Sequence, residues 1–274
     1  MPLTPVNHSL GIPFVELQSI DSTNNYALAQ IHANLAQPGT CYFAHEQTAG
    51  KGQRGRGWTS EKGSNILLSI VLNPLFLQPS QQFLLSACIA VAAHRYFSDF
   101  VSNDLKIKWP NDLYWKDRKL GGILIENVIG KSLTEKWQTT PRQEPKNPQW
   151  KWSVVGIGIN VNQKKFPVEL SNPASLVQIT GVKYNCIELA KNLCKRIDES
   201  YQRLVHGDYI SNLKLYNEFL YKKNEIVNFK KGNRNFQATV KSVNESGQLL
   251  VQHLIEEPID FGQVAWVQER NTGE

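Results

Sequence analysis

Short apolar runs rich in branched and aromatic residues recur along the first part of the chain, separated by polar or glycine-containing segments. Runs of this length and composition predict strands. The clearest are FVELQSI (14–20), CYFAHEQTA (41–49), ILLSIVL (66–72) and WSVVGIGINV (152–161). Two further runs, LKIKWPNDLYW (105–115) and KLGGILIENVIG (119–130), predict a hairpin whose turn lies at Asp117 and Arg118.

Helices are predicted between these strands, because apolar residues recur there every three or four positions. The first follows Ser22 or Thr23, either of which can cap its N-terminus. The apolar positions in this helix are Ala27, Ile31 and Leu35, and those in a long helix over 81–100 are Leu84, Leu85, Cys88, Val91, Ala92 and Phe97. A third helix has Ile187, Ala190, Cys194, Ile197, Tyr201 and Leu204 at these positions, and a fourth has Ile210, Leu213 and Leu220. Strands alternating with helices predict an α/β domain, placed at residues 1–221.

The pattern of hydrophobic and polar residues changes at about Lys222. Short alternating runs follow, separated by the turn-like segments KGNRN and NESG; the runs are EIVNF, FQATVKSV, QLLVQHL and QVAWV. This pattern predicts a small all-β barrel and therefore a second domain at residues 222–274. Between the two long strands of the first domain, residues 131–150 carry three prolines and many polar residues, which predicts a loop extension.

Composition places the chain among globular proteins, since its 274 residues are 41% hydrophobic and 20% charged. The first twenty residues contain no sustained apolar run after a basic start, and no later segment is expected to provide the roughly 20 apolar residues of a membrane span. We therefore expect a cytoplasmic protein without a membrane partner. The four cysteines form no CxxC pair and the six histidines no HxxxH spacing, so reduced, mostly buried thiols are expected.

The net charge of +6 fits a nucleic-acid partner, an acidic protein partner or a phosphate-bearing substrate. Solvated lysines on outer helix faces are the favoured explanation for most of these charges. Charge alone therefore leaves the function open.

One loop concentrates glycine and positive charge. GKGQRG (50–55) has the form GxGxxG, but RGWTSEKGSN follows and cannot begin the helix that a dinucleotide-binding turn requires. A Rossmann site is therefore excluded. Glycines at 50, 52, 55 and 57 and cations at 51, 54 and 56 suit a loop that approaches a phosphate or a carboxylate, although a surface loop without a ligand has the same composition.

A second cluster of candidate residues lies in KWPNDLYWKDRKLGGILIEN. The expected hairpin brings Asn111 and Asp112 close to Lys119, Gly121 and Gly122. The glycines let a ligand approach the lysine ammonium, and Asp112 is a candidate to hold Mg²⁺ or to orient a nucleophile. Taken alone, these residues favour a salt bridge in an exposed turn and turn-capping side chains.

Four segments in order resemble the motifs of biotin protein ligases: IDSTN (20–24), EQTAGKGQRGRGW (46–58), KWPNDLYWKDRKLGGILIE (108–126) and VVGIGINVN (154–162). The resemblance implies an α/β catalytic domain of the class II aminoacyl-tRNA synthetase and biotin ligase type, followed by a small C-terminal SH3-like β-barrel. It also implies an enzyme that uses ATP and Mg²⁺ to adenylate biotin and transfers the biotin to a lysine of a biotin carboxyl carrier protein or domain of a carboxylase.

The resemblance assigns roles to single positions. Lys119 is expected to bind substrate and, with Asp112, to act in catalysis; Asp112 is also the candidate Mg²⁺ ligand. The expected biotin-binding residues are Ser22, Thr23, Asn24, Gln47, Gly50, Lys51, Gly52, Gln53, Lys119, Gly121 and Gly122. The expected ATP- or adenylate-binding residues are Arg54, Arg56, Trp58, Asn111 and Asn160. Gln53 departs from the family, many of whose members have arginine there.

Alternatives remain at the level of the sequence. A lipoate ligase-like acyltransferase has the same broad fold, but the glycine-rich, histidine-bearing signature of those relatives is not found. A basic nucleic-acid-binding module would explain the charge and the RGRGW loop. Because IDSTN begins at residue 20, we expect no winged helix, no repressor function and no nucleic-acid partner. A homodimer is compatible with the family.

Overall fold

The computed structural model describes residues 9–101, 104–130, 149–170 and 172–267. Most of the predicted loop extension at 131–150 lies outside the described residues. Its last two positions, Gln149 and Trp150, begin a strand instead, and the side chain of Trp150 is buried.

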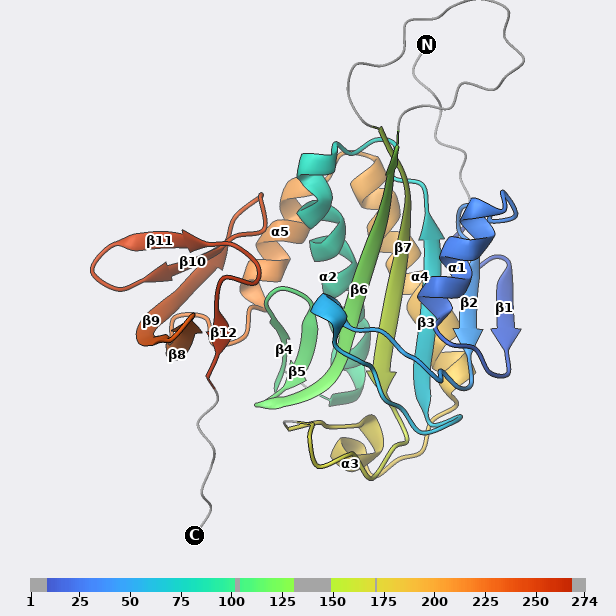
Figure 1. Ribbon diagram of the computed structural model, residues 1–274, viewed down its shortest axis with the longest axis horizontal. Helices are drawn as coiled ribbons and strands as arrows, with labels where there is room; N and C mark the ends of the chain where they lie inside the picture. The colour runs from blue at the N-terminus through green and yellow to red at the C-terminus, as the bar shows by residue number, and fades with distance from the viewer. Residues whose placement is uncertain (1–8, 102–103, 131–148, 171, 268–274) are drawn as a thin grey trace, which may run out of the picture.

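A seven-stranded sheet forms the centre of the larger part (Figure 1). Its order is β1 (Phe14–Leu17), β2 (Cys41–Ala44), β3 (Asn65–Leu72), β7 (Gln149–Asn160), β6 (Arg118–Gly130), β5 (Asp112–Trp115) and β4 (Leu105–Lys108). β1 and β2 are parallel, and all other neighbours are antiparallel. The predicted strand at 66–72 is confirmed, and every residue of β3 is buried.

The predicted hairpin over 105–130 contains three strands rather than two. LKIKWPNDLYW is divided into β4 and β5, which pair with each other, because the Trp109–Pro110 segment turns the chain between them. The following turn was misplaced: it consists of Lys116 and Asp117, and Arg118 already pairs with Trp115. Lys116 adopts a φ of 52°, so this two-residue turn has left-handed backbone geometry.

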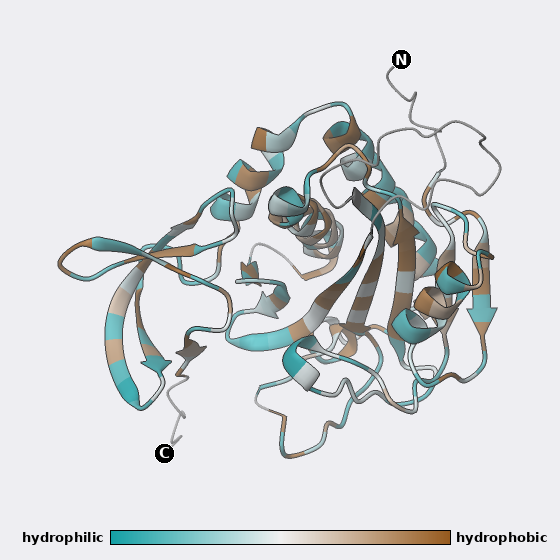
Figure 2. Ribbon diagram, turned by 45° about the horizontal axis from the view of Figure 1, so that its top comes forward, coloured by the Kyte–Doolittle hydropathy of each residue, from teal (hydrophilic) through white to brown (hydrophobic). Residues whose placement is uncertain are grey.

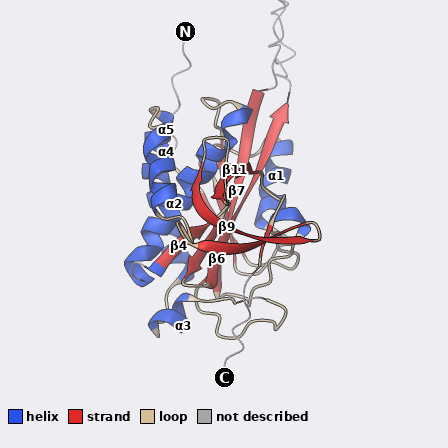
Figure 3. Ribbon diagram, turned by 90° about the vertical axis from the view of Figure 1, so that its left-hand side faces the viewer, coloured by secondary structure: helices blue, strands red, loops and turns tan. Residues whose placement is uncertain are grey.

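Helices cover both faces of the sheet (Figure 3). Helices α2 (Gln82–Val101), α4 (Cys186–Val205) and α5 (Tyr209–Glu218) lie on one face, and α1 (Thr23–His32) lies on the other. Figure 2 shows hydrophobic residues concentrated on the central strands between these layers. All four cysteines are buried and free, as expected.

Three details of the helices differ from the prediction. α1 ends at His32, so Leu35 lies beyond it and is 68% exposed. α5 ends at Glu218, and Leu220 instead pairs with Ile107 beside β4. A short helix, α3 (Leu176–Thr180), was not predicted, because five residues are too few to establish a periodic pattern.

The expectation that no segment resembles a membrane span was also wrong. Pro79–Val101, which contains α2, is long and apolar enough for one. However, 72% of its most apolar window is buried inside the protein, where it packs against α4 and the sheet. This is the environment of a core helix, which needs the same apolar composition.

The C-terminal part is a five-stranded antiparallel sheet in the order β11 (Glu256–Ile259), β10 (Leu249–Gln252), β9 (Arg234–Val243), β8 (Ile226–Lys231) and β12 (Ala265–Trp266). Phe229, Val240 and Val251 are among its buried side chains. The sheet contacts the larger part directly, since the Trp109 indole donates a hydrogen bond of 2.9 Å to the carbonyl of Gly247. The domain boundary at 221 stays a prediction.

Candidate active site

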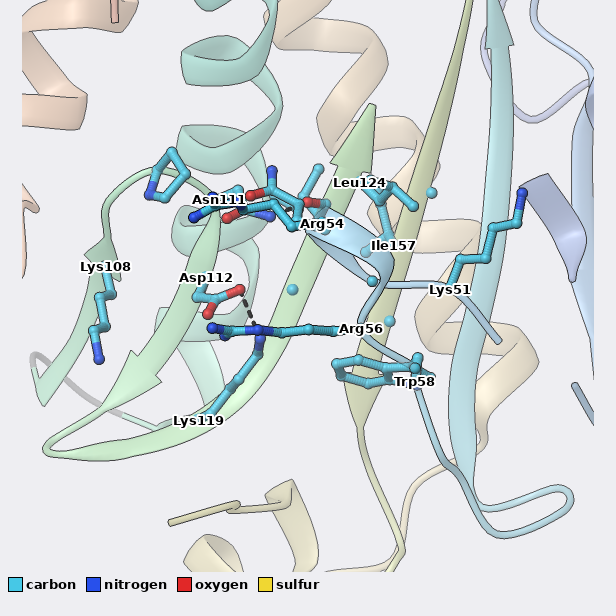
Figure 4. A pocket seen from close by; sticks show the side chains of 18 of the residues that line it. Lys51, Arg54, Arg56, Trp58, Lys108, Asn111, Asp112, Lys119, Leu124 and Ile157 are labelled. Carbon is cyan, nitrogen blue, oxygen red and sulfur yellow. Dashed lines mark hydrogen bonds and ion pairs between the residues drawn. The ribbon is translucent and has the colours of Figure 1, made fainter. Parts of the chain in front are cut away.

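A pocket of about 610 Å³ opens between the large sheet, the glycine and basic loop at 50–58 and the C-terminal sheet (Figure 4). Strands β3, β5, β6 and β7 form its floor, the start of α1 closes one end, and residues 261–266 close the other. The predicted site residues that line it are Ser22, Thr23, Asn24, Gln47, Lys51, Gly52, Gln53, Arg54, Arg56, Trp58, Asn111, Asp112, Lys119, Gly122 and Asn160.

Gly50 and Gly121 are predicted site residues that do not line this pocket. A side chain at Gly121 would collide with Ile159 and the carbonyl of Gly158, and one at Gly50 with the carbonyl of Trp58. Both glycines therefore allow close backbone packing behind the pocket wall. Gly122 does face the pocket, where a Cβ atom would lie 3.0 Å from Asp112 Oδ1 and 3.3 Å from Lys119 Nζ.

Lys119 and Asp112 meet on the pocket floor, as the hairpin predicted. Lys119 Nζ lies 2.7 Å from Asp112 Oδ1, and Figure 4 marks this ion pair between β6 and β5. The ammonium also lies 5.8 Å from the centre of the Trp58 ring. A cation, a carboxylate and an aromatic face therefore converge on one point, with both charged side chains partly exposed to the pocket.

The two asparagines assigned to the nucleotide side have additional structural contacts. Asn111 donates a hydrogen bond to the carbonyl of Ile123, and Asn160 donates one of 3.0 Å to the carbonyl of Ala174. These bonds hold the amide nitrogens towards the backbone, and the side-chain oxygens can accept a hydrogen bond from a ligand donor.

A buried polar cluster occupies the end of the pocket at α1. Gln47 Oε1 accepts hydrogen bonds from the backbone N–H of Thr23 at 2.8 Å and from its hydroxyl at 2.9 Å. Ser69 Oγ lies 2.7 Å from Thr23 Oγ1 and 2.6 Å from Asn24 Oδ1. Ser22 occupies the N-cap position of α1 but makes no capping hydrogen bond with its side chain. Its hydroxyl group is therefore not used by the helix, and the residue lines the pocket.

The glycine and basic loop is held from both sides. Lys51 Nζ lies 3.9 Å from Glu126 Oε1 on β6. Arg54, at a φ of 58°, donates a hydrogen bond of 3.2 Å to the carbonyl of Gly262, and its guanidinium lies 5.9 Å from the Phe261 ring. As predicted, the loop does not open a helix; it contains only a three-residue 3₁₀ turn at Gln53–Gly55.

Sequence reasoning missed several pocket residues. Gly156 and Gly158 on β7 provide the space for Asn24 and Trp58, because a Cβ atom would collide with the amide of Asn24 or lie 2.6 Å from the indole. Their alternation in VVGIGINV is a signal of close approach over one strand face. Ser69, the polar residue within ILLSIVL, was a second such signal.

Lys108 was also missed. It lines the pocket and is almost fully buried, and burial lowers its pKa to about 8. Its neighbour Tyr114 has its pKa raised, again chiefly by burial. No spacing in the sequence indicates that this lysine is buried, since Lys106 on the same strand is only partly buried.

Comparisons with known proteins identify similar chains. Residues 16–137 match the model of the biotin/lipoate A/B protein ligase family. Over these residues the chain is similar to this family. Its fold is that of the biotin protein ligases, as expected: the biotin protein ligase from Aquifex aeolicus in complex with biotin and ATP has a TM-score of 0.73 at 23% identity, with 93% of this chain and 98% of that chain covered. The second sheet fits the expected SH3-like part.

Among curated relatives of this ligase family, the bifunctional ligase/repressor BirA of Bacillus spizizenii is 31% identical over 195 residues, which is 69% of this chain and 54% of the relative. That of Escherichia coli is 28% identical over 240 residues, covering 86% of this chain and 68% of the relative. The chain thus spans about half to two thirds of the length of these relatives.

The donor set of the pocket bears on the expected magnesium site. Within the described residues no group of three or more Asp, Glu, His or Cys side chains is arranged to hold a metal ion. Asp112 supplies one carboxylate, and Mg²⁺ characteristically binds through one or two carboxylates together with substrate phosphates. The residues therefore fit an ion that enters with ATP, and the role of Asp112 as its ligand stays a prediction.

Proposed function

We propose that this chain is an ATP-dependent ligase that adenylates biotin and transfers the biotinyl group to a lysine of a biotin carboxyl carrier domain. The main observation in favour is the Lys119–Asp112 ion pair, which lies between the buried polar cluster at one end of the pocket and the arginines of the basic loop at the other. One end suits a polar ring, and the other suits phosphates.

In the first step, a carboxylate oxygen of biotin attacks the α-phosphorus of ATP and pyrophosphate leaves. Negative charge accumulates on the phosphate oxygens, and Lys119, Arg54 and Arg56 line the same pocket as fixed positive charges that offset it. Asp112 holds the Lys119 ammonium in place before the substrates arrive. Mg²⁺ bound to the phosphates would neutralise further charge.

In the second step, the neutral ε-amine of the acceptor lysine attacks the acyl carbonyl and AMP leaves. With an ordinary pKa of about 10.4, this amine must lose a proton. Asp112 is the pocket carboxylate on the floor beside Lys119 and is the proposed proton acceptor. The acyl phosphate is sensitive to water, so the basic loop, which rests on Glu126 and Gly262, would shield it.

The polar cluster favours biotin over lipoate as the acid that is activated. The dithiolane ring of lipoate carries no N–H or carbonyl group, so it would cover the Ser22 and Thr23 hydroxyls without offering them a hydrogen bond, and a buried polar group without a partner costs about 1 to 3 kcal/mol. We propose a carboxylase carrier domain as the acceptor and the cytoplasm as the location. A homodimer and the expected lack of a nucleic-acid partner stay predictions.

ATP–pyrophosphate exchange tests this function with biotin, with lipoate and with neither. Exchange is expected with biotin alone. Lys119→Ala should reduce it at least a hundredfold, because a fixed charge on the transition state is lost. Lys191→Ala, which removes a half-exposed lysine paired with Glu16 outside the pocket, is the control and should retain full exchange. Normal exchange in the Lys119 variant would remove this lysine from its role, and exchange with lipoate alone would reassign the substrate.

A further inference from the structure

Glu126 lies at the outer end of the buried polar cluster and has no role in the steps above. Its Oε2 accepts a hydrogen bond of 2.7 Å from Asn24 Nδ2, and its Oε1 faces Lys51. The second neighbour of Asn24 Nδ2, the carbonyl of Leu124 at 3.5 Å, is likewise only an acceptor. The orientation of the Asn24 amide is therefore fixed: nitrogen towards Glu126 and oxygen towards Ser69.

This orientation fixes the hydrogens of the next residues. Three oxygen–oxygen contacts follow in series: Asn24 to Ser69 at 2.6 Å, Ser69 to Thr23 at 2.7 Å, and Thr23 to Gln47 at 2.9 Å. Only two hydroxyl hydrogens, those of Ser69 and Thr23, are available to fill them. The Ser69 hydrogen must go to Asn24 Oδ1, which cannot donate. Thr23 has one hydroxyl hydrogen, and it can be donated either to Ser69 or to Gln47 but not to both.

The cluster thus has three oxygen–oxygen contacts but only two hydrogens for them, and the contact without a hydrogen is one of the two made by Thr23. Gln47 cannot supply the hydrogen by turning its amide, because its oxygen accepts the backbone N–H of Thr23. If Asn24 turned over, its NH₂ group would fill the series, but that would place the amide oxygen against the Glu126 carboxylate. Gly156 lets the amide pack closely against β7, where a Cβ atom would lie 2.9 Å from Asn24 Cγ.

We propose that Glu126 is a positioning residue that makes the Thr23 hydroxyl an acceptor for a ligand N–H group. The proposal rests on the proposed function, in which the ligand ring is the cyclic urea of biotin, a group that carries N–H donors. The ligand N–H then donates to the Thr23 hydroxyl oxygen, which accepts no hydrogen from the other members of the cluster. Glu126 acts through Asn24 and Ser69, without touching the ligand itself.

Glu126→Gln tests this idea, because glutamine can donate to Asn24 Oδ1 and lets the amide turn over. All three oxygen contacts of the cluster then contain a hydrogen, and the Thr23 oxygen accepts from Ser69 in competition with the ligand N–H. We expect biotin, titrated calorimetrically, to bind about three- to tenfold more weakly, the net worth of one hydrogen bond. The melting temperature of the ligand-free protein should be unchanged or raised. A residue with a merely structural role would lower both.

Thr23→Val separates this route from the Lys51 ion pair, which Glu126→Gln also removes. Valine keeps the backbone N–H that holds Gln47 but has no hydroxyl, so Glu126→Gln should change biotin affinity less than about twofold in that background. Glu16→Gln, which neutralises another half-exposed carboxylate paired with a lysine, is the matched control and should bind biotin like the parent.

Each outcome bears on a different claim. Two results would overturn the positioning role and leave the proposed function in place. One is an undiminished effect of Glu126→Gln in the Thr23→Val background. The other is a Glu126→Gln variant that binds biotin as tightly as the parent. No biotin binding by the parent protein overturns the proposed function together with the ligand assigned to this cluster.

Discussion

Lys108 is a buried charge whose removal should stabilise the protein. Its Nζ lies 4.4 Å from the centre of the Tyr114 ring, 5.4 Å from that of Trp266 and 5.6 Å from that of Tyr221. It also donates a hydrogen bond of 3.3 Å to the Tyr114 hydroxyl. Among the described residues, no carboxylate lies within ion-pair distance of this ammonium. Aromatic faces therefore replace water around it without a full countercharge.

The magnitude follows from the pKa, which burial lowers from 10.5 to about 8. At 1.36 kcal/mol per pKa unit, folding with the protonated lysine costs on the order of 3 kcal/mol. Because the folded pKa is below the unfolded value, this cost is fully present below pH 8. It declines as the pH rises, and it vanishes above about 10.5, where the unfolded chain also loses the proton.

Lys108→Met keeps an unbranched stem against the same rings and removes the charge. After the loss of the cation–π contacts, we expect a gain of about 1 to 3 kcal/mol in the free energy of unfolding at pH 7. Urea titrations of parent and variant at pH 7 and pH 9.5 measure it, and the gap should shrink by more than half at the higher pH. Lys106→Met, on the same strand but partly exposed, is the control. A gap that does not depend on pH, or a variant less stable than the parent at pH 7, would refute the reasoning.

Two further predictions concern contacts that shape the pocket. Gly158→Ala places a Cβ atom 2.6 Å from Trp58, so the indole must move away from Lys119. We expect at least a tenfold loss of biotin-dependent exchange with the circular dichroism spectrum unchanged. The control is Gly130→Ala, whose Cβ atom meets only a lysine side chain at 3.9 Å and which should have no effect. Phe261→Ala removes the ring beside Arg54 and should raise the KM for ATP several-fold with little change in biotin affinity. The control is Leu254→Ala, at a 99% exposed site in the turn between β10 and β11, which should leave the KM for ATP unchanged.

Elements with long, regular patterns were predictable from the sequence. The run at 66–72 was expected to be a buried strand, and the stripe from Ile187 to Leu204 a helix, because each pattern reports the burial of one element by itself. The errors fall where another element decides the outcome. Trp109–Pro110 breaks a run that reads as one strand, and Leu220 leaves its helix to pair with Ile107.

The site was predictable to the extent that its residues stand in recognisable motifs. Lys119 and Asp112 were expected to meet because a hairpin joins them. By contrast, Glu126 reaches Asn24 across 102 positions of the sequence, and Arg54 reaches Gly262 across 208. Periodicity carries no information about such distant partners, so neither the second anchor of the loop nor the carboxylate behind the polar cluster could be read from the chain.

The pocket combines a rigid floor with a weakly held cover. The basic loop rests on an ion pair of 3.9 Å, with Lys51 43% and Glu126 31% exposed, and on an exposed hydrogen bond of 3.2 Å from Arg54. The Phe261 ring beside Arg54 and the contact of Trp58 with Lys119 add to these. Each of these contacts contributes on the order of 1 kcal/mol or less, so the loop can open at a cost of a few kcal/mol. The polar cluster below it is buried, and any change in its hydrogen-bond directions requires several groups to turn together. Ligand entry is therefore expected to depend on the loop, whereas the choice of ligand depends on Asn24, Ser69 and Thr23.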